Sequence, residues 1–253
     1  MVDKNIIENA FNKAMSNSYK YKCGIGLMLP KNVITSFNNF HDKFCTNKEK
    51  IEHLLVTDKD GNVVYENSGD ENSVEFSNVL RYNLYKQHGQ LYTTHNHPRV
   101  SSDLVIGEVA ECLSNPDISN LFDKNYNFSP KQEFMEKSIS CESFNGSRMT
   151  LTISDEFDVK NSSNCIKLGK QLVEYWQDYD TTYYDTFGDV LNEYSMTDFN
   201  NDSDKYIEYC MNKTFEKIGI FEKNPKFKEI QNKYRNVGVK LTYTFPRPYH
   251  VGA

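Results

Sequence analysis

The strongest constraint on the fold is a pair of β-prone runs separated by a tight-turn sequence. Residues 51–57 and 62–66 are rich in aliphatic and β-branched side chains, and Asp58-Lys59-Asp60-Gly61 lies between them. An Asp-Gly pair between two such runs is a strong hairpin signal, because glycine readily adopts the positive φ that these turns need. We therefore predict two adjacent antiparallel strands.

The segment after this hairpin alternates helix and strand signals. Ser73 is an N-cap candidate for a helix that runs to about Gln87, where Gly89 provides a stop. A β-prone run follows at residues 91–97, and the apolar spacing of residues 104–113 indicates another helix. This order predicts an α/β (α+β) fold with a mixed sheet flanked by helices.

Three regions follow from the remaining patterns. Residues 1–48 form a mainly helical N-terminal extension with a predicted amphipathic helix at 5–15. Residues 49–158 form a core that includes a hairpin at Asn145-Gly146, and residues 159–253 a mainly helical C-terminal region. In the C-terminal region, periodicity predicts helices within 164–194, at 203–218 and at 226–234, followed by a strand-like run at 237–245.

Composition and charge exclude several classes of protein. The net charge of −6 argues against a nucleic-acid binder, and no apolar run approaches the roughly 20 residues that span a bilayer. The six cysteines include no C-x-x-C pair, which indicates reduced thiols in a cytoplasmic protein. The abundance of Asn, Lys, Tyr and Phe suggests a low-GC bacterium or its phage as the source.

Two histidines at the end of the 91–97 run carry the chemical signal. His95 and His97 are two residues apart in a predicted strand, so their imidazoles point to one face. Pro98 then ends the strand. Two neutral imidazoles and one carboxylate would make a three-ligand zinc site with an open position for water.

Glu52 and the sequence His95-Asn96-His97-Pro98 resemble the JAB/MPN (JAMM) metallopeptidase superfamily, including its RadC-like and phage-encoded branches. The family pattern is a glutamate on an early strand, then H-x-H-P, six residues and S-x-x-D. Counting this interval places Glu108 at the aspartate and Val105 at the serine. The resemblance covers residues 52–154.

The resemblance implies a zinc-dependent peptidase or isopeptidase. Its ligands would be His95, His97 and Glu108, with Asp103 as the alternative third ligand if the turn is shorter, and Glu52 would be the general base. The implied substrate is an amide bond in a protein or peptide, often at the tail of a ubiquitin-like protein.

One residue in this alignment favours a different interpretation. Val105 cannot donate the hydrogen bond that the family's serine supplies, so Ser102 or Ser101 would have to replace that serine through a shifted turn. If neither does, we expect a non-catalytic JAB-like scaffold or binding protein, with a structural or host-interaction role in a phage as an example. The sequence carries no signal for an oligomeric state.

Overall fold

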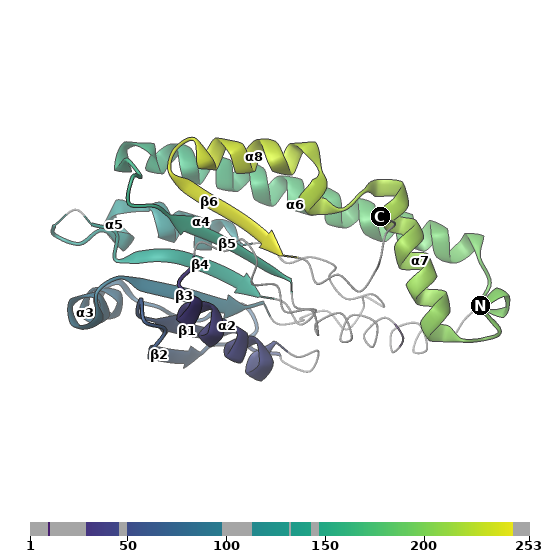
Figure 1. Cartoon of the computed structure of the whole chain (residues 1–253), viewed down its shortest axis with the longest axis horizontal. Helices are drawn as coiled ribbons and strands as arrows, with labels where there is room; N and C mark the ends of the chain where they lie inside the picture. Colours follow the sequence, from purple (N-terminus) through teal and green to yellow (C-terminus); the bar gives the residue numbers. More distant parts are fainter. Residues whose placement is uncertain are drawn as a thin grey trace.

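A six-stranded mixed sheet forms the centre of the molecule (Figure 1). The computed structural model describes residue 10 and residues 29–45, 50–97, 113–131, 133–142 and 147–244. The strand order is β2-β1-β3-β4-β5-β6. Only β3 and β4 pair in parallel, and the other neighbouring strands are antiparallel. The strands are β1 (His53–Thr57), β2 (Val63–Ser68), β3 (Leu91–Asn96), β4 (Glu136–Glu142), β5 (Arg148–Ile153) and β6 (Val239–Thr244).

Helices cover both faces of this sheet, which confirms the predicted α/β class. They are α2 (Lys31–Phe44), α3 (Asn78–His88), α4 (Asn115–Phe122), α5 (Lys124–Asn127), α6 (Ser162–Glu193), α7 (Ser203–Ile218) and α8 (Pro225–Arg235). Short 3-10 turns lie at η1 (Val159–Asn161), η2 (Met196–Phe199) and η3 (Phe221–Lys223). No helix in the described part of the chain is long and apolar enough to cross a membrane.

The hairpin that the Asp-Gly turn predicts is confirmed. β1 and β2 are antiparallel, and Gly61 has a φ of +80°. The Asp58 carboxylate accepts hydrogen bonds from the backbone N–H groups of Asp60 and Asn62, both at 2.9 Å. This is the local side-chain turn that Asp forms readily, and it joins the end of β1 to the start of β2.

Alternate residues of the central strands contact different helices. Leu54 and Leu91 pack with Leu84 of α3, whereas Leu55 and Tyr92 pack in a cluster with α2. His95 pairs with Leu54 across the β1–β3 ladder, so its side chain lies on the α3 face of the sheet. The two faces therefore have separate hydrophobic clusters, and the histidines belong to only one of them.

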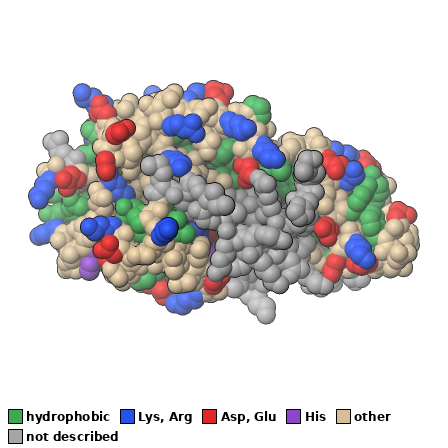
Figure 2. Space-filling view, in the orientation of Figure 1, with side chains coloured by type: hydrophobic (Ala, Val, Ile, Leu, Met, Phe, Trp, Pro, Cys, Tyr) green, Lys and Arg blue, Asp and Glu red, His purple; other side chains and the backbone are tan. Residues whose placement is uncertain are grey.

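The largest hydrophobic cluster continues across residue 158. It joins Leu151 of β5 to Leu172 of α6 and Leu241 of β6, so the C-terminal region contributes both a covering helix and a strand to the sheet. Beyond this cluster, the second half of α6 packs on α7 and extends away from the sheet (Figure 1). Basic and acidic side chains are interspersed over the described residues on the face shown in Figure 2.

Some local predictions differ from the structure, and others concern residues that the structure does not describe. The N-cap of α3 is Ser77, not Ser73, because the Ser77 side chain accepts from the backbone N–H of Leu80. The helices α4 and α5 were not predicted from the sequence, and α2 was predicted only as part of a mainly helical N-terminal extension. The predicted helices at 5–15 and 104–113 and the Asn145-Gly146 turn lie outside the described residues, apart from Ala10, which is helical.

Gly169 of α6 allows α6 to lie against α4. A Cβ atom added at Gly169 would lie 2.4 Å from Cγ2 of Ile118 in α4. We expect Gly169→Ala to lower the free energy of unfolding by about 1–3 kcal/mol, because overpacking forces a neighbour to move. Chemical denaturation would measure this loss.

Gly188 of the same helix is the matched control. A Cβ atom there meets nothing within 4 Å, so Gly188→Ala should be neutral or stabilise the protein by up to about 1 kcal/mol through helix propensity. Equal effects of the two substitutions would contradict the close α4–α6 contact.

Candidate metal centre

The structure brings the two predicted histidines together on one face. His95 lies in β3 and His97 follows its last residue, and their Nε2 atoms are 3.1 Å apart. The His95 side chain is 3% exposed and that of His97 is 26% exposed. One imidazole is therefore embedded in the fold, and the other borders solvent.

Asn96, between the histidines, clamps β3 to the start of β1. Its Oδ1 accepts from the backbone N–H of His53 at 2.6 Å, and its Nδ2 donates to the carbonyl oxygen of Ile51 at 3.2 Å. These two backbone groups flank Glu52. The asparagine thereby fixes the segment that carries the predicted base, a role that the sequence did not indicate.

Glu52 lies one residue before β1 and is held by backbone bonds on its other side. Its N–H donates to the Asp70 carbonyl at 2.7 Å, and its carbonyl accepts from Gly69 N–H at 2.8 Å. Burial raises the pKa of the Glu52 carboxyl, although the neighbouring His95 and His97 act in the opposite direction. A raised pKa suits a carboxylate that exchanges protons near neutral pH.

Asp117 is the acid that the described structure places beside the histidines. Its Oδ2 lies 3.3 Å from His95 Nε2 and 3.9 Å from His97 Nε2. The side chain is 19% exposed. Sequence reasoning missed this residue.

A capping box at the start of α4 positions Asp117. The Asp117 carboxylate accepts from the backbone N–H of Ser114 at 2.8 Å and from its hydroxyl at 2.6 Å, and the Ser114 hydroxyl oxygen faces the Asp117 N–H at 3.3 Å. The sequence Ser114-Asn115-Pro116-Asp117 carried two signals. It is a helix N-terminus with proline in the first turn, and it is an S-x-x-D sequence at a longer interval from Pro98 than six residues.

The other sequence-predicted site residues are not part of the described structure. Ser102, Asp103, Val105 and Glu108 all lie within residues 98–112, which fall outside the described residues. Their assigned roles stay predictions.

The donor set fits a zinc ion. Ligand atoms about 2.0–2.1 Å from a tetrahedral ion are roughly 3.3 Å apart. The nitrogen–nitrogen distance of 3.1 Å and the nitrogen–oxygen distances of 3.3 and 3.9 Å are close to that value. His95, His97 and Asp117 could therefore hold zinc with small side-chain adjustments.

Without a metal, these groups form an ion pair. Burial disfavours the charged form of His95, but the Asp117 carboxylate outweighs this and raises the pKa of His95 to about 9. In the same way, burial opposes the charge on Asp117, and His95 holds the pKa of that carboxyl well below its usual range. Protonated His95 thus neutralises Asp117 at pH 7.

A further potential ligand lies beside the histidines. Cys141 of β4 offers a sulfur atom within 4.8 Å of a ring nitrogen of His95 and of His97. Cys141 is fully buried.

A second group of donors lies on the α2 face of the sheet. His41, Cys45 and Glu142 are buried together there. The Glu142 carboxylate already accepts from Arg148 Nη2 at 2.9 Å and from Thr94 Oγ1 at 2.7 Å. A guanidinium beside the carboxylate repels a cation, so this group fits a role in packing α2 on the sheet and not in metal binding.

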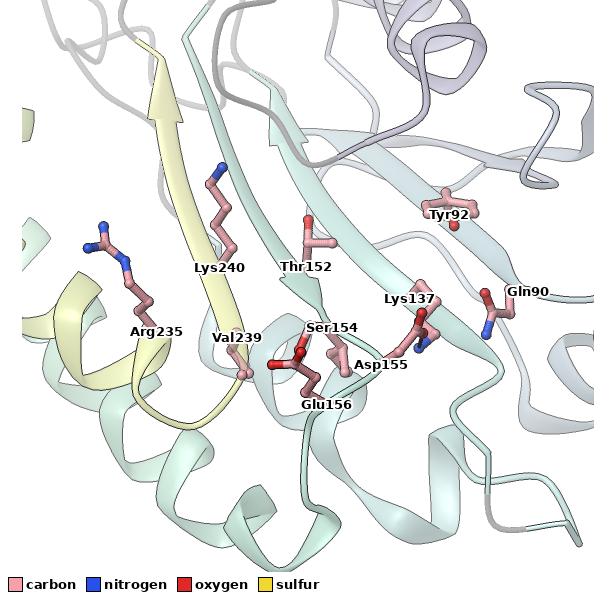
Figure 3. Close-up of a pocket in the computed structure, with 12 residues that line it drawn as sticks. Gln90, Tyr92, Lys137, Thr152, Ser154, Asp155, Glu156, Arg235, Val239 and Lys240 are labelled. Atoms are coloured by element: carbon pink, nitrogen blue, oxygen red, sulfur yellow. Dashed lines mark hydrogen bonds and ion pairs between the residues drawn. The ribbon is translucent and has the colours of Figure 1, made fainter.

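A pocket of about 590 Å³ is separate from the metal centre (Figure 3). Its lining residue Tyr92 packs with α2, so the pocket opens on the sheet face opposite to His95. Lys137 in this pocket forms an ion pair with Asp155 at 2.7 Å. The lining contains no histidine or cysteine, and we assign no metal chemistry to it.

No protein-family model, curated protein or solved structure matches the chain. The geometry of the site is therefore what supports a function.

Zinc affinity should rise with pH. Zinc binds neutral imidazole, and the His95 pKa of about 9 means that its proton must leave when the ion binds at pH 7. Below pH 9 the affinity should increase by up to about tenfold per pH unit from this group alone. Calorimetry in buffers with different ionisation enthalpies would detect the released proton, and an affinity unchanged between pH 6 and 8 would contradict it.

Asp117→Asn should lower zinc affinity by more than about 100-fold, because the loss of outer-shell partners alone costs about 10–100-fold. The matched control is Asp198→Asn in η2, since Asp198 forms the same capping box with Ser195. Both variants replace the carboxylate of a capping box by an amide, but only the first should lose zinc in competition with a chelator. Equal zinc affinities would exclude Asp117 as a ligand.

Proposed function

We propose that the protein is a zinc-dependent hydrolase of amide bonds in proteins or peptides, similar to the JAB/MPN (JAMM) metallopeptidases. The observation that carries the proposal is the convergence of two imidazoles and a carboxylate from separate elements. His95 and His97 come from the end of β3, and Asp117 comes from the first turn of α4. Glu52, from the start of β1, interacts electrostatically with all three.

His95, His97 and Asp117 would hold the ion. Zinc bound there supplies Lewis acidity and lowers the pKa of a coordinated water to about 7. The capping box keeps Asp117 directed at the histidines. The Asn96 side chain would hold Glu52 near the histidines, because it forms hydrogen bonds with the backbone of Ile51 and His53 on either side of Glu52.

Glu52 would be the general base. Its partial burial and raised pKa favour a carboxylate that takes a proton from the attacking water and returns it to the leaving amine. Glu52 would not bind the metal ion itself, because the three ligands are other residues.

Ser114 takes the position of the serine in the S-x-x-D pattern when Asp117 takes that of the aspartate. Its hydroxyl bonds to the Asp117 carboxylate, so we assign it the orientation of that ligand. A protein substrate with a ubiquitin-like tail is carried over from the resemblance alone.

Metal analysis and one substitution test the proposal. Purified protein should contain one zinc per chain, and the absence of zinc after reconstitution would refute the enzyme and leave the non-catalytic binding module. Glu52→Gln should keep the zinc and reduce hydrolysis of a fluorogenic ubiquitin amide or peptide amide by about 10²–10⁴-fold.

Glu66→Gln is the matched control for this substitution. Glu66 lies on β2 of the same hairpin and forms a surface ion pair with Lys43 at 2.8 Å. Its loss should leave hydrolysis within about twofold of the wild type, because exposed ion pairs contribute at most about 1 kcal/mol. Full activity of Glu52→Gln would show that Glu52 is not the base.

A further inference from the structure

Granting the proposed function, on which this inference rests, we propose that Cys141 is a fourth protein ligand of the zinc ion. The resting metal centre would then be closed by His95, His97, Asp117 and Cys141. Hydrolysis would then require one of these ligands to leave the ion so that water can bind.

The pairing of the two central strands places Cys141 at the centre. β3 and β4 run in parallel, and His95 is the register partner of Cys141. Partners on neighbouring strands lie about 4.8 Å apart with side chains on the same face. His97 is two residues beyond His95 and returns to that face, so the sulfur lies next to both imidazoles.

The Cys141 sulfur and the ring nitrogens of the two histidines are close enough to bind one metal ion. The Cys141 sulfur and one ring nitrogen of each histidine all lie within 4.8 Å of one another. Zinc–sulfur bonds of about 2.3 Å and zinc–nitrogen bonds of about 2.0–2.1 Å place tetrahedral donors roughly 3.3–3.6 Å apart. Relative to the two histidine nitrogens, the Cys141 sulfur therefore needs a shift of little more than about 1 Å at most.

The chemistry of the donors favours binding of the sulfur. Zinc is a borderline-soft ion that binds thiolate well, and a coordinating thiol is deprotonated by the metal. Cys141 has 0% exposure and belongs to the main hydrophobic cluster. Because the sulfur is buried, few water molecules would compete with it for the ion.

Other buried cysteines show that this arrangement is not a general feature of the core. Cys165 and Cys210 are also fully buried, but neither belongs to a group of potential metal donors in the described part of the chain. Cys165 provides a matched control for that reason.

The number of ligands has a chemical consequence. A catalytic zinc site keeps three protein ligands and one open position, whereas four protein ligands are typical of a closed site. With Cys141 bound, hydrolysis should require one ligand to leave the ion in each turnover so that water can bind. The centre should also prefer thiophilic ions such as Zn²⁺, Co²⁺ and Cd²⁺ over Mg²⁺.

Cobalt substitution tests the assignment without any activity measurement. Full-length protein loaded with one equivalent of CoCl₂ should show visible d–d bands and, in the near ultraviolet, a sulfur-to-cobalt charge-transfer band. Cys141→Ala should lose the charge-transfer band and still bind cobalt through the other three ligands. Cys165→Ala should keep the full spectrum.

The outcomes separate this inference from the proposed function. Cobalt bound without a sulfur band, or a band that survives in Cys141→Ala, overturns the role of Cys141 and leaves the hydrolase in place. No binding of cobalt or zinc overturns both.

X-ray absorption at the zinc edge of the wild-type protein covers the case in which Cys141→Ala does not fold. A scattering shell at about 2.3 Å supports a sulfur ligand, and a shell only at about 2.0–2.1 Å overturns it.

Discussion

The metal centre depends on the position of β3 between β1 and β4. In this strand His95 has Leu54 as its antiparallel partner and Cys141 as its parallel partner. A shift of either register by one residue would turn the facing side chains to the opposite side of the sheet. The burial of Leu54 and Leu91 against α3 opposes such a shift, so hydrophobic packing also sets the geometry of the polar site.

The capping box of α4 serves the helix and the site at once. Ser114 and Asp117 satisfy backbone groups at the helix start that would otherwise lack partners. The same bonds direct the Asp117 carboxylate at His95. Hydrogen bonds within the first turn of one helix therefore orient the Asp117 carboxylate toward the histidines.

The features that could be predicted from sequence are local ones. The Asp58–Gly61 turn, the i, i+2 histidines and the position of Glu52 follow from the nearby chain, and the structure brings Glu52, His95 and His97 together. Asp117 was missed because counting a fixed interval assumes a fixed loop length, whereas the free energy of loop closure changes slowly with length. The pairing of Cys141 with His95 depends on non-local strand register, which no short pattern encodes.

The contact between Gly169 and Ile118 links the site to distant parts of the chain. Ile118 follows Asp117. Gly169 lies near the start of α6, a helix of 32 residues whose second half forms a cluster with α7. A helix of this length spans about 48 Å. Because α6 is unbroken, a single helix packs both against α4, whose first turn carries Asp117, and against α7.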